Sequence, residues 1–411
     1  MAIDTREELI NALHEACEIE HSLLVQYLYA ALSVKKGLDE GLTPHQQRLA
    51  RDWQARMLVI AREEMGHLGI ACNLLAAIGA PAKLERPAMP RGTGYYPFSF
   101  DLLPFGDEAL YKFLVFELPR GFPPPPPPGA DLDAREMQPS ALASVAPEPL
   151  EYEYVGELYA KIAEGFRAIP QDQLFIGPET AQTANDWSDR TLDIRVVTDR
   201  ASAIAAIENI IVDGEGTPQS TDRSHYNGFL EVRRRYFAEQ RFDAARRVPK
   251  NPATRVNPKA DGPVTLIKNP TGVRLTELFN ASYGVMLLML QHYFSLAPRA
   301  DDAVGAASRR ALQLASQRIM SVAVRPLAEE VTKAPLDDPQ APERAGPSFE
   351  IYSDVSLSPY PGARWTILLE RLDALVAECA DLGEELPRVG AIGETLSIMR
   401  GDLAAVARGG A

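Results

Sequence analysis

A glutamate and a histidine three residues apart, Glu64 and His67, form the pair in this sequence with the clearest chemical meaning. They belong to a run of mostly apolar residues at alternating spacings of four and three: Trp53, Met57, Ile60, Glu64, His67, Ala71, Leu74 and Ile78. This spacing places both side chains on the buried face of a helix. A buried carboxylate needs a cation or a dense hydrogen-bond network. Glu-x-x-His is half of the ligand set of a di-iron carboxylate centre, although such a pair on an arbitrary helix more often lies on a solvated face.

A further carboxylate, Glu20, occupies the same kind of position on the preceding helix. Thr5 and Glu8 form a capping box that predicts a helix from there to about Lys36. Within it the four-three spacing continues through Leu13, Cys17, Glu20, Leu24 and Tyr27. We therefore expect Glu20 to face the core, either as a metal ligand or paired with an arginine.

The helix that carries Glu64 should lie antiparallel to the first. It begins with a threonine cap and a proline at Thr43-Pro44 and stops at Gly79. A long connection follows, with aromatic and proline-rich pieces and a short helix near Glu108 to Glu117. One long crossover between the second and third helices is the connectivity of a four-helix bundle that builds metal sites in its core.

The third and fourth helices supply less certain ligands. Helix is predicted over Tyr152 to Ala168, where Glu157 is the candidate, although three neighbouring glutamates compete with it: Glu151, Glu153 and Glu164. The fourth helix begins near Arg200 and breaks at Gly214 to Pro218, then resumes at His225. If residues 217–223 loop out, Glu215 and His225 recreate a second Glu-x-x-His in space. Glu208 is an alternative carboxylate on the same face, and a plain turn between two helices is the alternative for the break.

Together the candidates are four carboxylates and two imidazoles on four helices: Glu20, Glu64, His67, Glu157, Glu215 and His225. This is the number of ligands of a di-iron or di-manganese centre. Carboxylates offset the charge of two hard cations, and each neutral histidine completes one metal. We expect two iron ions, with manganese and a single metal left open.

Several of these segments, in order and approximate spacing, resemble the ferritin-like family of the iminophenyl-pyruvate dimer synthase type. The matching segments are Glu18 to Leu23, Ala61 to Leu68, Asn73 to Gly79, Val155 to Tyr159, Gly214 to Gly216 and Ser224 to Tyr226. The resemblance covers roughly residues 1 to 240 and supports Glu157 and Glu215 over their neighbours. It implies an iron-dependent oxidative enzyme of secondary metabolism that acts on imines derived from aromatic amino acids. Two departures are Ile211-Val212-Asp213, where Glu-Gln is expected, and a chain much shorter than the large pathway enzymes.

The composition limits the partners. A formal charge of -14 disfavours nucleic acid and anionic membranes, which both favour a basic surface. The start of the chain lacks the pattern of a secretory signal, and the longest apolar run, near Tyr283 to Leu290, is too short to span a bilayer. Three cysteines at unrelated spacings predict small core residues of a cytoplasmic protein: Cys17, Cys72 and Cys379.

The expected fold is all-α: a ferritin-like bundle over residues 1–247, followed by a C-terminal helical region, residues 248–411, that packs on it. Helices are predicted there at Leu275 to Ser295, Ala303 to Lys333 and Trp365 to Leu382. The proline run Pro123 to Pro128 predicts an extended surface segment. The sequence leaves the oligomeric state open, a homo-oligomer included.

The leading hypothesis is a non-haem di-metal oxidase or oxygenase that uses O2 on a small organic substrate. Its pocket would lie under the crossover, lined by aromatic residues that could equally fill a core: Tyr95, Tyr96, Phe98, Phe100 and Phe105. The alternatives are iron oxidation or metal binding without an organic substrate, and a ferritin-like module without catalytic activity.

Overall fold

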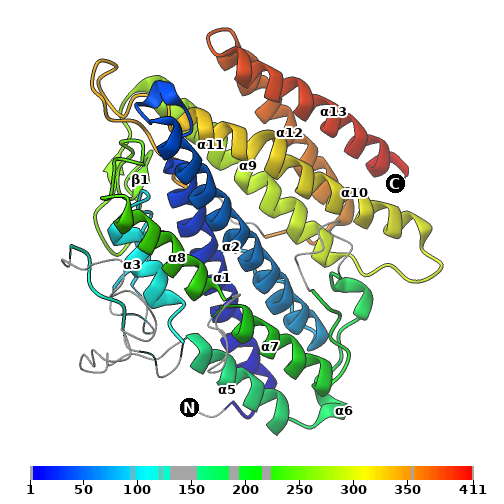
Figure 1. Cartoon of the computed structure of the whole chain (residues 1–411). Helices are drawn as coiled ribbons and strands as arrows, with labels where there is room; N and C mark the ends of the chain where they lie inside the picture. The colour runs from blue at the N-terminus through cyan, green and yellow to red at the C-terminus, as the bar shows by residue number, and fades with distance from the viewer. Residues whose placement is uncertain are drawn as a thin grey trace.

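Two long antiparallel helices, α1 and α2, form the centre of the molecule (Figure 1). The computed structural model describes residues 3–92, 94, 96, 98–119, 122, 124–129, 155–184, 194–214, 224–352 and 356–409. α1 is Arg6–Ser33 and α2 is Pro44–Ala77, with the short 3-10 turn η1, Leu38–Glu40, between them. Both helices begin with the predicted capping boxes, at Thr5 and Thr43. After α2 the chain turns at Gly79, where φ is 85°, a conformation that favours glycine.

Shorter helices complete the bundle around this pair. They are α3 (Asp107–Phe116), α5 (Val155–Ala168), α6 (Gln171–Leu174), η2 (Glu179–Ala181), α7 (Arg200–Gly214) and α8 (His225–Ala238). α8 and α7 follow one another along α2, so the fourth helix of the bundle is broken as the sequence predicts (Figure 1). α5 packs against α1 and α7, and α3 packs against α8. The two short helices α5 and α3 therefore complete the bundle beside α7 and α8.

The C-terminal region is also helical. Its elements are the paired strands β1 (Pro252–Ala253) and β2 (Thr265–Leu266), then α9 (Pro270–Ser295), α10 (Ala303–Ile319), the π-helical turn η3 (Met320–Val324), α11 (Arg325–Val331), α12 (Pro361–Gly383) and α13 (Pro387–Gly409). The π-helical turn leads into α11, whose second residue is Pro326, and the proline nitrogen cannot donate the regular helical hydrogen bond. No helix is predicted from the sequence where α13 lies.

Buried apolar residues form two clusters that meet at α1. The first joins α1 to α2, α3, α5, α7 and α8. The second joins the opposite face of α1, including Val25, Tyr29 and Leu32, to α9 through α13. The three cysteines are free and buried, as predicted. No helix in the described part of the chain combines the length and the apolar character needed to cross a membrane.

Candidate metal centre

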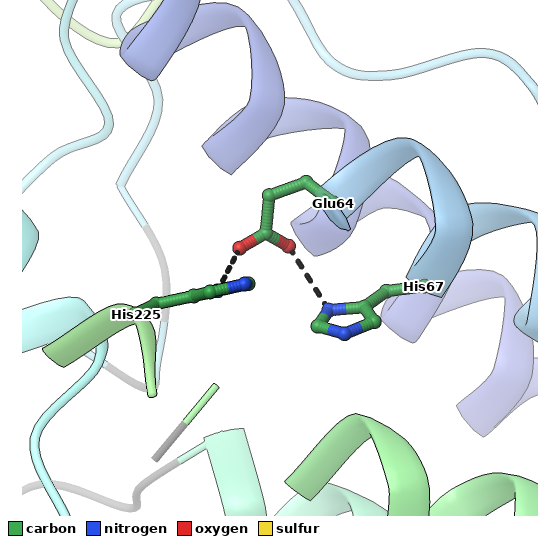
Figure 2. A group of neighbouring side chains, drawn as sticks. All are labelled: Glu64, His67 and His225. Atoms are coloured by element: carbon green, nitrogen blue, oxygen red, sulfur yellow. Dashed lines mark hydrogen bonds and ion pairs between the residues drawn. The ribbon is translucent and has the colours of Figure 1, made fainter. Parts of the chain in front are cut away.

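Glu64, His67 and His225 meet in the interior of the bundle (Figure 2). One ligand atom from each side chain lies within 4.8 Å of the other two. Their exposed fractions are only 1%, 3% and 1%, respectively. Glu64 and His67 come from consecutive turns of α2, whereas His225 is the first residue of α8, which is capped by the Ser224 hydroxyl. The cap and the broken helix therefore set where the second imidazole enters the core.

These three side chains lie close together but form few well-aligned hydrogen bonds. The Glu64 carboxylate lies between the two rings, with Oε1 2.8 Å from Nδ1 of His225 and Oε2 3.3 Å from Nδ1 of His67 (Figure 2). The 2.8 Å contact does not have the alignment of a hydrogen bond. Three buried ring nitrogens consequently have no hydrogen-bond partner among the described residues: Nε2 of His67 and both nitrogens of His225. Since such groups cost about 1–3 kcal/mol each when unpaired, this donor set fits a bound cation.

Four more carboxylates surround the two imidazoles. Oε2 of Glu20 lies 3.6 Å from Nδ1 of His67, and Oε2 of Glu117 lies 3.7 Å from Nδ1 of His225. Both carboxylates are buried. Glu63 and Asp213 approach from more exposed positions, at 3.2 Å from Nε2 of His225 and 3.8 Å from Nε2 of His67. Oxygen and imidazole ligands together suit iron or manganese.

Two buried tyrosines orient the two inner carboxylates. The Tyr159 hydroxyl on α5 donates to Glu20, and the Tyr27 hydroxyl on α1 donates to Glu117. Burial, together with the nearby negative charge, raises the pKa of both tyrosines well above its usual range. Both hydroxyls therefore stay protonated and act as donors. Hydrogen bonds of this kind commonly orient the ligands of a metal.

The carboxylates also shape the acid-base properties of the site. Burial, and then the charge of Glu64, raises the pKa of Glu20 to about 7. Burial alone would lower the pKa of His67 and of His225, but the surrounding carboxylates outweigh it and raise both pKa values well above their usual range. The interior thus concentrates negative charge that a cation or a proton must balance.

The structure brings together four of the six residues predicted as ligands. Glu20, Glu64, His67 and His225 converge from α1, α2 and α8. Glu157 lies half-buried on the first turn of α5, and no interaction found among the described residues joins it to this group. Its neighbour two residues later, Tyr159, makes the contact with Glu20 instead.

The fourth-helix carboxylate remains a prediction. Glu215 lies outside the described residues. The chain does reach the cluster just before it, because a Cβ built on Gly214 would lie 3.2 Å from Oε2 of Glu117. Glu208, the alternative, is exposed on α7, and no interaction found among the described residues links it to the cluster.

Sequence reasoning missed Glu117. It follows α3 directly, after the apolar residues Phe113 to Phe116, and the residue is only 5% exposed. The only sign of it in the sequence is a carboxylate that directly follows four apolar residues. Only the packing of α3 against α8 shows that this carboxylate faces His225.

The aromatic residues of the crossover fill the core. Tyr96 and Phe100 pack on Phe116, and Phe105 stacks on Trp53 with ring centroids 5.5 Å apart. Tyr95 lies outside the described residues. The buried residues of this group pack against other aromatic side chains of the core. They therefore do not support the expectation that the group lines a substrate pocket.

Comparison with known proteins places these observations in a family context. The model of a family described as Ferritin-like matches residues 13–234. The chain is 30% identical over 393 residues to dichlorochromopyrrolate synthase from Lentzea aerocolonigenes, covering 85% of this chain and 36% of that protein. It is 25% identical over 360 residues to 2-imino-3-(indol-3-yl)propanoate dimerase from Chromobacterium violaceum, covering 79% of this chain and 32% of that protein. The chain thus spans about a third of the length of both relatives.

A solved structure is also similar. It is described as a ferritin like protein from Caulobacter vibrioides, with a TM-score of 0.44 and 18% sequence identity over 78% of this chain and 98% of that chain.

Proposed function

Because the chain belongs to the Ferritin-like family, we propose that its buried cluster of carboxylates and imidazoles holds iron and that the protein is an oxygen-dependent oxidase or oxygenase. The observation that carries the proposal is the set of buried ring nitrogens without hydrogen-bond partners beside buried carboxylates. The proposed ligands are Glu20, Glu64, His67, Glu117 and His225, with Glu215 as the sixth. In this proposal Glu117 replaces Glu157 as a ligand.

The protein residues have separable roles in this proposal. Bound iron supplies the redox chemistry with O2. Glu64 lies between the two imidazoles, so it would hold the metal together with His67 and His225. Tyr27 and Tyr159 hold Glu117 and Glu20 in place through their hydroxyls. The apolar core around the cluster excludes bulk water, which strengthens these electrostatic interactions.

The substrate class comes from the relatives. One is named for 2-imino-3-(indol-3-yl)propanoate, an imine of an aromatic 2-oxo acid, and the other for the synthesis of a dichlorochromopyrrolate. We infer that this chain also acts on a small organic imine derived from an aromatic amino acid. Because it spans about a third of those relatives, its own product is not inferred from theirs.

Oxygen consumption tests the proposal. The protein is loaded with ferrous iron without oxygen, then exposed to O2 with and without an aromatic 2-oxo acid plus ammonium, which equilibrate with the imine. We expect turnover beyond the bound iron only with the imine, and its loss in Glu64→Gln. Glu208→Gln, an exposed carboxylate of α7, is the matched control and should keep full activity. Oxygen use that scales with ferrous iron alone would instead indicate iron oxidation, and no iron binding would indicate a module without catalytic activity.

A further inference from the structure

A cavity of about 500 Å³ lies apart from the candidate metal ligands, none of which lines it. Three chain segments form its walls: residues 85–89 of the crossover, residues 251–259 around β1, and residues 348–352 before α12. β1 marks the place in Figure 1. The volume falls within the range of roughly 300–1,000 Å³ typical of small-molecule sites.

Three cations line this cavity: Arg86, Arg255 and Lys259. None of them forms a salt bridge within 4.0 Å in the described parts of the chain, although the charge of Glu350 acts on Arg86. Arg86 is the least exposed of the three. Its guanidinium donates to the backbone carbonyls of Pro87 and Phe349 and interacts with the Tyr283 side chain, while its buried Nε has no hydrogen-bond partner among the described residues. Arg255 and Lys259 are exposed. The cavity therefore combines one inner arginine with two cations at its rim.

Two carboxylates, Glu85 and Glu350, also line the cavity, and each has polar partners in the protein. Glu350 accepts hydrogen bonds from Thr254 and Ser348 at 2.8–3.1 Å, and Asn280 lies 3.3 Å from the same oxygen. Glu85 lies 3.7 Å from Lys83. The donors to Glu350 are neutral, so its charge acts on Arg86 as well. The lining nevertheless holds three cations against two carboxylates, and Glu85 also pairs with Lys83, so a net positive charge is left here although the protein as a whole carries a formal charge of -14. A local excess of this sign attracts an anion.

Two strained residues fix the walls. Asn251 and Phe349 are buried, line the cavity and have φ values of 46° and 51°, which non-glycine residues seldom adopt. The Asn251 side chain is held by Asp101 and by the backbone N–H of Leu102, while the Phe349 carbonyl holds Arg86. Strain of this kind persists where the surroundings enforce it, and it clusters at ligand sites. Here it positions the inner arginine.

Part of the cavity wall is apolar, and Met89, Leu102 and Ile351 contribute to it beside the polar groups. We propose that this cavity binds a small organic carboxylate, whose anionic group pairs with Arg86 and whose apolar body lies against this wall. Arg255 and Lys259 draw the anion in from solvent. This inference does not depend on the metal.

Calorimetric titration of the whole chain, with no metal added, tests the site. The probes are 3-phenylpropanoate, its neutral analogue 3-phenylpropanamide, and inorganic phosphate. We expect saturable one-to-one binding of the carboxylate and binding at least roughly tenfold weaker for the amide and for phosphate, the loss expected when a charged hydrogen bond or the apolar contact is missing. Equal binding of the amide, tighter binding of phosphate, or no binding of the carboxylate would overturn the proposal.

Variants locate the site. Arg86→Gln should weaken carboxylate binding roughly ten- to hundredfold, while Arg86→Lys should retain part of it. The exposed double variant Arg255→Gln/Lys259→Gln does not disturb the core, so it gives a second test, with binding weakened several-fold and more so at low salt. Arg91→Gln is the control, because Arg91 is exposed, pairs with Asp261 at 3.4 Å and does not line the cavity. Unchanged carboxylate binding in both Arg86→Gln and Arg255→Gln/Lys259→Gln would contradict the assignment.

Discussion

Replacing Tyr27 by phenylalanine separates the role of one hydroxyl from the packing of its ring. Tyr27 is fully buried, and its ring lies 4.7 Å from that of Phe113 and 4.8 Å from that of Phe229, measured between centroids. Phenylalanine keeps these contacts and removes only the O–H that donates to Glu117. The substitution therefore tests whether an oriented Glu117 matters for metal binding.

The substitution should change both the stability of the protein and its affinity for metal. A hydrogen bond to a charged group contributes about 1.5–3 kcal/mol, so the free energy of unfolding should fall by about that amount. Loss of a group that orients a metal ligand lowers metal affinity roughly 10–100-fold. We expect both effects in Tyr27→Phe, measured by urea unfolding and by competition for ferrous iron with a coloured chelator.

Tyr29→Phe is the matched control. Tyr29 lies on the same helix and is equally buried, but its hydroxyl donates to the backbone carbonyl of Pro249, away from the cluster. It should lose about 1 kcal/mol of stability and keep its metal affinity. If Tyr27→Phe binds iron as tightly as the native chain, or if Tyr29→Phe loses the same affinity, the assigned role of Tyr27 is wrong.

Four other substitutions test separate parts of the account. Glu117→Gln should lower iron affinity at least tenfold and Glu157→Gln should not, as followed by the same competition assay. Burial lowers the pKa of His292 from 6.5 to about 4, so the unfolded chain binds its proton more readily, and unfolding should become easier by up to about 3 kcal/mol as the pH falls from 6.5 to 4; His292→Phe should flatten this dependence in urea titrations. Lys112→Met leaves the buried Asp101 without its closest cation and should cost about 3 kcal/mol; a loss below 1 kcal/mol would show that the pair contributes little.

Local patterns predicted most of the helices and part of the site. Capping boxes at Thr5 and Thr43 mark both long helices because they depend on residues three apart in sequence. The four-three spacing put Glu20 and Glu64 on buried faces for the same reason. The break before His225 was visible as glycine and proline.

Other features depend on contacts between distant segments. Glu117 joins the cluster only because α3, inside the crossover, packs on α8, and no local pattern encodes that contact. Glu157 has the expected spacing, but the rotation of α5 presents Tyr159 to Glu20 instead. α13 is a different case, since its buried residues Val389, Ile392, Leu396, Met399 and Leu403 do follow the spacing. Its glycines at 390, 393 and 401 lower helix propensity and obscure the pattern.

Metal content tests the central claim most directly. The protein is reconstituted with ferrous iron without oxygen, freed of loosely bound metal, and analysed by elemental mass spectrometry, with manganese as a parallel arm. We predict two tightly bound iron ions per chain and the loss of both in Glu64→Ala/His67→Ala. A native chain that retains no metal, or a double variant that retains as much metal as the native chain, would contradict the account.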